Sequence, residues 1–320
     1  MMGSGGDIGA AKKEERKYGR IRKGVGGFYT VDEWVPDANE REDASGRYWE
    51  CRLRGRFRRE KQDVLPGDLV AFAIVDDAGS KGIVEEILPR KNRLTRPPVA
   101  NVDQALIVLA VDQPEPDLWL LDRLLLMIQA ADIQPLLCWN KEDLAGDGCL
   151  QEYMRPYQAA GVTQLITCAL NGTGLSQLGE KLADKTTVLA GPSGVGKSSL
   201  LNQIEPGIAL KTGEVSDKLG RGRHTTRHVE WIPLTQGGWV ADTPGFSQMV
   251  MPETISSASL ADYFPEFDPF LANCRFRSCL HEQENDCGIS QGVREGEIDE
   301  GRYKRYLSFL HDLKDRERRY

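Results

Sequence analysis

The chain has 320 residues, of which 40% are hydrophobic and 28% are charged, with a formal net charge of −7. This length exceeds one ordinary core, so two or three domains are expected, and the composition is that of a soluble globular protein. No apolar run is long enough to span a membrane, and residues 1–16 lack an apolar signal core, which is typical of a flexible tail. We therefore expect a cytoplasmic protein with no membrane partner.

Residues 17–95 predict a small β-barrel. Glycine or polar turns separate four short β-prone runs, GRIRKGVGGFYTV, RYWECRLRGRF, DLVAFAIV and GIVEEILPR. This pattern fits an OB-fold RNA-binding domain, although an SH3-like barrel would have almost the same sequence pattern.

The barrel contains a strongly basic stretch. Residues 47–61 carry seven basic and two acidic residues, with Tyr48, Trp49 and Phe57 interleaved. This suits contact with RNA phosphates and stacking on bases, while a solvated basic face is the plain alternative. The C-terminal segment 301–320, a predicted helix, holds seven basic and three acidic residues, so both ends of an acidic chain are locally positive.

Residues 96–255 predict a doubly wound α/β domain. VDQALIVLAV is almost continuously apolar, as expected of a parallel strand buried on both faces. The helical spacing of LLDRLLLMIQAADI follows, and then the apolar run QPLLCWNK. Strands and helices continue to alternate through a helix near 150–160, QLITC, LSQLGEKL, TTVLAG, VEWIPL and GWVAD.

A phosphate-binding loop follows the predicted strand TTVLAG. The string GPSGVGKS matches G-x-x-x-x-G-K-[ST] and leads into the helix-compatible run SSLLNQI. Glycines let the backbone wrap a phosphate, Lys197 supplies charge to the β- and γ-phosphates, and the Ser198 hydroxyl is placed to bind Mg²⁺. The candidate loop residues are Gly191, Pro192, Ser193, Gly194, Val195, Gly196, Lys197, Ser198 and Ser199.

A second motif selects the base. Asn140, Lys141, Glu142 and Asp143 follow an apolar strand. A carboxylate such as Asp143 accepts hydrogen bonds from guanine N1–H and the 2-amino group together, whereas adenine offers neither. Sites of this kind can reject the wrong ligand by about 10⁴–10⁵-fold. The motif therefore argues for GTP and against the alternative of a P-loop ATPase or kinase.

Two further segments complete a GTPase constellation. Asp242 follows the strand GWVA, where it can hold a Mg²⁺-bound water, and Gly245 can approach the γ-phosphate. The segment GRHTT at 222–226 lies where a loop would supply a threonine to Mg²⁺. Each alone is more often an ordinary turn. The base motif precedes the phosphate loop by about fifty residues, the reverse of the usual order, which a circular permutation explains because domain termini are often close together.

A Cys/His cluster lies in the last segment, residues 256–320. The spacing Cys274-x4-Cys279-x-His281-x5-Cys287 predicts a closed tetrahedral structural zinc site that holds a helical C-terminal domain together. Reduced thiols that cluster by chance are the alternative. The other cysteines are expected to be small buried hydrophobes.

From residue 17 onward, the order NKED, GPSGVGKSSL, GRHTT, DTPGF and Cys/His cluster resembles the RsgA family of circularly permuted GTPases. The resemblance implies a role in late maturation of the small ribosomal subunit, with binding to rRNA and subunit-stimulated hydrolysis of GTP to GDP and phosphate. It also makes Cys168 and Ala169 a base-side loop and His224 a candidate catalytic group beside Lys197 and Asp242. We expect a monomer.

Two features leave the catalytic details open. Arg227 stands where a third threonine is usual, so either Thr225 or Thr226 meets Mg²⁺. Phe246 stands where Ras-like enzymes place a water-orienting glutamine, so slow intrinsic turnover is expected. Our hypothesis is that His224 orients the water when the ribosome orders its loop; a phosphate-contacting or structural role is the alternative. A nucleotide-gated RNA-binding assembly factor with little turnover remains the second reading of the whole chain.

Overall fold

The computed structural model describes residues 16–34, 44–59, 62–207, 229–242 and 251–319. Contacts group the chain into two compact units, Met1–Arg90 and Lys91–Tyr320. Residues 1–15 of the predicted tail (1–16) and the GRHTT segment lie outside the described residues, while Arg16 begins the first strand.

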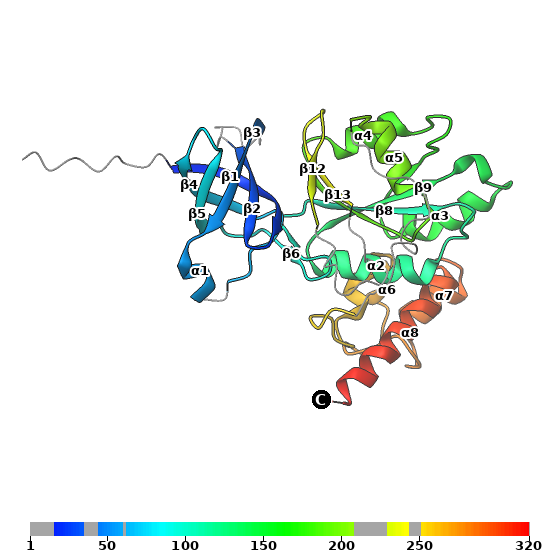
Figure 1. The fold of residues 1–320 in the computed structure, drawn as a ribbon. Coiled ribbons are helices and arrows are strands. Elements are labelled where there is room, and N and C mark those ends of the chain that lie inside the picture. The colour runs from blue at the N-terminus through cyan, green and yellow to red at the C-terminus, as the bar shows by residue number, and fades with distance from the viewer. Residues whose placement is uncertain (1–15, 35–43, 60–61, 208–228, 243–250, 320) are drawn as a thin grey trace, which may run out of the picture. The chain divides into compact units, whose positions relative to one another are not determined.

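The first unit is a closed five-stranded barrel, as predicted (Figure 1). Its strands follow the order β1-β2-β3-β5-β4, and antiparallel pairing of β1 with β4 closes the barrel, as in an OB-type fold. A short helix, α1 (Gly55–Arg59), follows β3. The strands are β1 (Arg16–Val25), β2 (Phe28–Trp34), β3 (Ala44–Leu53), β4 (Leu69–Asp76) and β5 (Lys81–Ile87).

The barrel corrects one prediction about aromatic residues. Trp49 is fully buried, Phe57 is 3% exposed, and both belong to the barrel core. Successive side chains of a strand point to opposite faces, so Trp49 points inward while its neighbour Tyr48 is 60% exposed. The Trp49 indole N–H donates to the Glu33 carboxylate at 2.9 Å. The prediction that Trp49 and Phe57 stack on bases is therefore wrong.

The second unit contains a six-stranded sheet with helices on both faces (Figure 1). The order is β10-β9-β8-β11-β13-β12, and all neighbours are parallel except the edge strand β12. The strands are β8 (Gln104–Ala110), β9 (Gln134–Asn140), β10 (Thr163–Ile166), β11 (Thr186–Ala190), β12 (Trp231–Pro233) and β13 (Trp239–Asp242). A small ribbon, β6 (Arg93–Leu94) and β7 (Val99–Ala100), precedes them.

Two apolar layers cover this sheet and confirm the doubly wound prediction. One layer packs α2 (Leu118–Ala130) and α3 (Cys149–Ala159) on one face. The other packs α4 (Leu175–Leu182) and α5 (Lys197–Ile204) on the opposite face. Chain order reverses between β8 and β11, and ligands of such sheets bind at the carboxyl ends of the strands beside this reversal.

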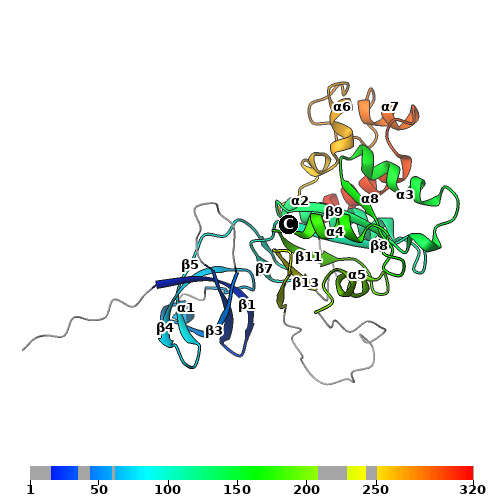
Figure 2. The ribbon, with the colours of Figure 1, turned by 90° about the horizontal axis from the view of Figure 1, so that it is seen from above.

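The C-terminal part packs its own helices against α2 (Figures 1 and 2). An apolar cluster gathers Phe264, Phe267, Tyr306 and Phe309 around Leu126 of α2. None of the described helices combines the length and the apolar character needed to cross a bilayer. The elements are η2 (Leu260–Tyr263), η3 (Pro265–Phe267), α6 (Asp268–Leu271), α7 (Gly288–Arg294) and α8 (Glu300–Glu317).

A buried group of charged side chains joins α2 to these C-terminal elements. Asp122 of α2 is 1% exposed and accepts hydrogen bonds from Arg302 Nη1 at 2.7 Å and from Arg305 Nε. Arg302 Nε donates to Glu266 Oε1 at 2.6 Å. Burial by itself lowers the pKa of Arg302, but the attraction of Asp122 and Glu266 outweighs it and raises the pKa above its ordinary value. One carboxylate of α2 thus holds two arginines of α8.

Replacing Asp122 by asparagine is expected to lower the free energy of unfolding by about 3–5 kcal/mol, because buried arginines lose their counter-charge. Urea unfolding followed by tryptophan fluorescence measures the change. Asp312→Asn, which removes an exposed carboxylate from α8, is the matched control and should change the free energy by less than about 0.5 kcal/mol. Equal stability of the two variants would contradict this role for Asp122.

Candidate functional site

The predicted phosphate loop connects β11 to α5. A Cβ atom added at Gly191 would lie 2.1 Å from the Val108 carbonyl oxygen, so the loop passes directly against β8. Gly196 has φ +96°, and its added Cβ would lie 2.2 Å from Asn140 Nδ2. Lys197 Nζ donates to the carbonyl oxygens of Gly191 at 2.8 Å and Pro192 at 2.7 Å. The ammonium is thus held at the loop, where a P-loop lysine meets phosphate.

Asn140 joins the base motif to the phosphate loop. Its side chain is 1% exposed, and Nδ2 donates to the Val195 carbonyl oxygen at 2.7 Å. Its Oδ1 accepts from the Thr167 hydroxyl at 3.1 Å. Both ends of the amide are therefore used, which fixes its orientation. The structure brings together two segments that lie 55 residues apart in the chain.

Asp143 is held from the side by Cys168. The Cys168 thiol is buried and donates to Asp143 Oδ1 at 2.9 Å, while Asp143 itself is exposed. The backbone N–H of Glu142 donates to the Thr167 carbonyl oxygen at 3.2 Å. The base motif and the predicted base-side loop therefore lie side by side. Ala169 is partly buried, and the neighbouring Leu170 is 88% exposed.

Sequence reasoning missed Thr167 and part of the role of Lys141. Thr167 is fully buried and also contacts Cys138 Sγ at 3.0 Å, so it supports the Asn140 amide from behind. Its position directly after β10, one residue before Cys168, was the available signal. Lys141 adopts φ 62°, and its Nζ donates to the Gln113 carbonyl oxygen in the loop before α2. Lys141 thus connects the base motif to the loop between β8 and α2.

Replacing Cys168 by alanine is expected to weaken GDP binding by about 2–10-fold, because Asp143 loses a hydrogen-bond donor that orients it. Cys168→Ser keeps a donor and should bind GDP at least as tightly as the unmodified chain. Isothermal titration calorimetry measures the dissociation constants. Cys149→Ala, which changes a partly buried cysteine of α3, is the control. Equal affinity of the alanine and serine variants would contradict the orienting role.

Other predicted catalytic residues are placed only in part. Asp242 ends β13 and pairs in register with Leu189 of β11, so its backbone lies at the same sheet edge as the phosphate loop. Ser198 is partly buried in the first turn of α5. His224, Thr225, Thr226 and Gly245 lie outside the described residues, so their roles stay predictions, as does Mg²⁺ binding by Ser198.

The Cys/His cluster predicted as a metal site comes together in space. One ligand atom from each of Cys274, Cys279, His281 and Cys287 lies within 4.8 Å of every other. His281 Nδ1 is 3.5 Å from the sulfur atoms of Cys274 and Cys287. A tetrahedral zinc site with its usual bond lengths separates sulfur and nitrogen ligands by about 3.6 Å. The four side chains therefore fit one tetrahedral ion.

The protonation chemistry of the cluster also suits a cation. Burial lowers the pKa of His281, so the imidazole is neutral and available as a ligand at neutral pH. Burial also raises the pKa of the Cys279 thiol to about 12, so a thiolate there requires a neighbouring positive charge such as a metal ion.

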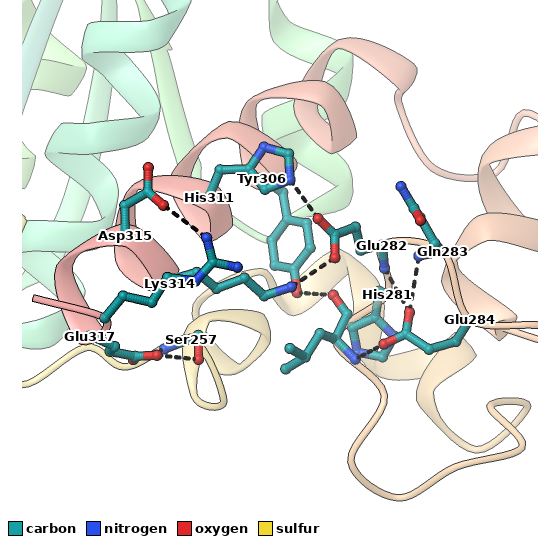
Figure 3. Close-up of polar contacts among 12 residues, drawn as sticks. Ser257, His281, Glu282, Gln283, Glu284, Tyr306, His311, Lys314, Asp315 and Glu317 are labelled. Carbon is teal, nitrogen blue, oxygen red and sulfur yellow. Dashed lines mark hydrogen bonds and ion pairs between the residues drawn. The ribbon is translucent and has the colours of Figure 1, made fainter.

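A shell of polar contacts holds the loop that carries His281 (Figure 3). The Glu284 carboxylate accepts from the backbone N–H groups of Leu280 at 2.7 Å and Glu282 at 2.9 Å. Burial tends to raise the pKa of Glu284, but these backbone bonds outweigh it and lower the pKa. From α8, Tyr303 donates to the His281 carbonyl oxygen at 2.7 Å and Tyr306 donates to that of Leu280 at 2.8 Å. This shell adds hydrogen bonds to the loop's backbone beside the four predicted metal ligands.

A second clamp ties the same loop to α8. Glu282 accepts hydrogen bonds from Lys314 at 2.7 Å and from His311, and these contacts lower its pKa (Figure 3). At the end of α8, the Glu317 carboxylate accepts from the backbone and hydroxyl of Ser257, each at 2.7 Å. The helix thus connects the Cys/His cluster with the segment that enters the C-terminal part.

The fold and site together define a class of protein. A phosphate loop follows β11, a base-reading motif follows the earlier strand β9, and Asn140 links the two. This is the arrangement of a circularly permuted P-loop GTPase. Residues 87–252 match the family described as RsgA GTPase, and residues 18–84 match the RsgA N-terminal domain. The chain belongs to the RsgA GTPase family, as its motifs predicted.

Individual relatives extend over nearly the whole chain. A small ribosomal subunit biogenesis GTPase RsgA from Caldanaerobacter subterraneus is 46% identical over 305 residues, covering 95% of this chain and 98% of the relative. The protein of the same name from Bacillus subtilis is 43% identical over 306 residues, covering 94% and 99%.

Two solved structures share the fold over nearly their full lengths. YjeQ from Thermotoga maritima has a TM-score of 0.75 and 32% identity, covering 93% of this chain and 98% of that one. YloQ, described as a circularly permuted GTPase, has a TM-score of 0.75 and 37% identity, covering 96% and 99%.

Proposed function

We propose that this protein acts in late maturation of the small ribosomal subunit, where it binds rRNA and hydrolyses GTP to GDP and phosphate with stimulation by the subunit. The observation that carries the proposal is the Asn140 bridge, the hydrogen bond from Asn140 to Val195 that holds the predicted base motif against the predicted phosphate loop. The names and near-complete coverage of the relatives support the ribosomal setting. The protein works in the cytoplasm as a monomer. Light scattering of the purified chain tests the monomeric state.

Each part of the nucleotide site has a proposed role. Asn140, Lys141 and Asp143 hold the guanine, with Cys168 and Ala169 beside it. The loop from Gly191 to Ser199 binds the phosphates, and Ser198 holds Mg²⁺ together with Thr225 or Thr226. Asp242 holds a Mg²⁺-bound water, and Gly245 approaches the γ-phosphate.

The Cys/His cluster holds one structural Zn²⁺ per chain, which links the two ends of the ligand loop. Three thiolates and one imidazole leave no coordination position open for water, so the ion supplies stability and takes no part in hydrolysis. The ligand distances and the neutral His281 imidazole support zinc. The zinc-binding part spans residues 256–320, the GTPase part 96–255 and the barrel 17–95.

His224 orients the attacking water, because Phe246 can neither donate nor accept a hydrogen bond. His224→Ala is expected to lower subunit-stimulated turnover by about 10²-fold or more while the affinity for GTP stays unchanged. Single-turnover hydrolysis with purified subunits measures the rate, and calorimetry measures the affinity. Full stimulated turnover in His224→Ala would leave His224 with a phosphate-contacting or structural role.

One measurement tests the function as a whole. The hydrolysis rate of the purified protein is determined with and without small ribosomal subunits, and ATP serves as the control. A slow basal rate that rises strongly with subunits, and only with GTP, is expected. Tight GTP binding with no rise would favour the second function, a nucleotide-gated RNA-binding assembly factor.

A further inference from the structure

We propose that the turn between the first two ligand cysteines, residues 275–278, is a contact for single-stranded RNA, in which Phe276 stacks on an unpaired base and Arg275 and Arg277 meet the flanking phosphates. The proposal rests on the proposed action on rRNA and adds a specific contact. It concerns a surface different from the basic stretch of the barrel.

The turn presents its aromatic side chain from a fixed backbone. Cys279 N–H donates to the Phe276 carbonyl oxygen at 3.2 Å, which closes a tight turn. Arg275 N–H donates to the Asp286 carbonyl oxygen at 3.1 Å, tying the start of the turn to the opposite side of the ligand loop. Cys274 and Cys279, the residues that bound the turn, both belong to the metal cluster. A turn whose backbone is held this way loses little conformational freedom on binding, which favours stacking on its side chain.

Phe276 lies in water although its ring is large and apolar. Its side chain is 48% exposed, and Arg275, Arg277 and Ser278 around it are also exposed. Trp119, a similarly exposed aromatic residue, is different because its ring packs edge-on against Phe309 at 6.0 Å. Phe276 therefore offers exposed aromatic surface on which a partner could stack.

The charges beside Phe276 identify the chemistry of that partner. The Arg275 guanidinium lies 5.5 Å from the centre of the Phe276 ring. Its ion pair with Asp286 is 3.3 Å long with both side chains largely exposed, so it contributes little and can be exchanged for a phosphate. In the part of the chain that the structure describes, Arg277 makes no ion pair. An aromatic face between two arginines matches a base between two phosphates.

A protein partner fits this surface less well. The cores of protein interfaces are depleted of charge, and an aromatic anchor there is surrounded by other apolar groups. Here the immediate chain neighbours of Phe276 are both arginines. An A-form duplex fits less well too, because its stacked bases leave no face for the ring.

Photo-crosslinking of the full-length, zinc-loaded protein tests the proposal. The probe is an oligo(U) of about ten nucleotides that contains 4-thiouridine, and adducts are mapped to peptides by mass spectrometry. An adduct on the peptide that contains Phe276 is expected. Its yield should fall about tenfold in Phe276→Ala and stay near the original in Phe276→Trp, because stacking needs an aromatic face. Adducts on the barrel should stay unchanged and provide an internal reference.

Arginine variants separate binding from the photochemistry of the ring. Arg277→Gln leaves Phe276 in place and should lower the adduct yield about threefold, more at higher salt, because one phosphate contact is lost. Arg294→Gln makes the same charge change on the exposed surface of α7 and should have no effect. Zinc content and GDP affinity, measured for every variant, report whether the chain is folded.

Three results would overturn the proposal: no adduct at Phe276 in the unmodified protein, equal yields from Arg277→Gln and Arg294→Gln, or equal labelling by a duplex probe. A loss of adduct when an excess of a ribosomal protein is added, with no competition by unlabelled RNA, would assign the turn to a protein partner instead. The readout needs no hydrolysis, so failure of subunit-stimulated GTPase activity, which would reject the proposed function, is recognised separately.

Discussion

Asp143→Asn is expected to weaken GDP and GTP binding by about 10³-fold or more and to confer binding of xanthosine nucleotides. The carboxylate accepts two hydrogen bonds from guanine, whereas an amide can accept only one and turns its N–H₂ group toward the guanine amino group. Two donors that face each other in the complex, with no acceptor between them, are strongly unfavourable. Xanthine carries an oxygen where guanine carries the 2-amino group, so it accepts from the new amide.

The contact with Cys168 makes this expectation specific. The thiol donates to Asp143 Oδ1 at 2.9 Å, so an asparagine at this position keeps its oxygen on the thiol and is left with Nδ2 facing the base. Asp143→Asn should therefore prefer xanthine over guanine nucleotides, because the amide does not rotate to present its oxygen to the guanine amino group. In Cys168→Ala, where this restraint is absent, Asp143→Asn should discriminate less sharply between guanine and xanthine.

Competition of GDP, XDP and ADP against a fluorescent guanine nucleotide measures the effect. Asp147→Asn makes the same change on an exposed residue a few positions further along the chain and is the matched control. It should bind GDP like the original. If Asp143→Asn kept the original affinity for GDP, the base would be read by other groups and the assignment of this motif would be wrong.

The parts of the site that could be predicted are those that a short sequence motif records. Glycine at positions 191 and 196 is required because a side chain there would collide with Val108 or Asn140, so the sequence itself records the close approach. The cysteine and histidine spacing likewise reflects the size of one coordination shell. The alternation of strand-like and helix-like segments predicted the sheet, because the spacing of apolar residues in each segment follows from its local backbone geometry.

The remainder depends on pairings between distant segments. Arg302 meets Asp122 across 180 positions, and before the fold is known nothing distinguishes this aspartate from other acidic residues. Thr167 supports Asn140 only because β10 lies beside β9. The inward direction of Trp49 follows from the register of β3, and a basic stretch with aromatic residues does not fix that register.

Loss of the metal is expected to unfold the ligand loop while leaving guanine binding in place. Zinc binding by such ligand sets is worth about 10–16 kcal/mol, comparable with the whole stability of a domain. The rings of Phe267 and Tyr306 pack beside the cluster, with their centres 6.3 and 6.4 Å from the centre of the His281 ring. Cys287→Ser should therefore lose the zinc and the hydrogen-exchange protection of residues 264–298.

The nucleotide site and the C-terminal part of the second unit should respond differently to Cys287→Ser. The Asn140 bridge and the Cys168 contact involve no residue of the C-terminal part, so Cys287→Ser should change the GDP dissociation constant by less than about threefold. The hydrogen bonds of Arg302 with Asp122 and Glu266 should also weaken, because Glu266 and Arg302 lose the packing around them. Lower protection in α2 as well as α8 would report this.

Zinc content by elemental analysis and hydrogen exchange by mass spectrometry measure both parts, and Cys149→Ser controls for the loss of a thiol elsewhere. If Cys287→Ser kept one zinc per chain, or kept full protection without it, the cluster would not be what holds this loop. If the loop unfolded and GDP binding collapsed with it, the C-terminal part would be a structural support of the nucleotide site. A collapse of GDP binding would couple contact with the ribosomal subunit to nucleotide affinity. Any partner that distorts the ligand loop would then also weaken binding of the guanine base.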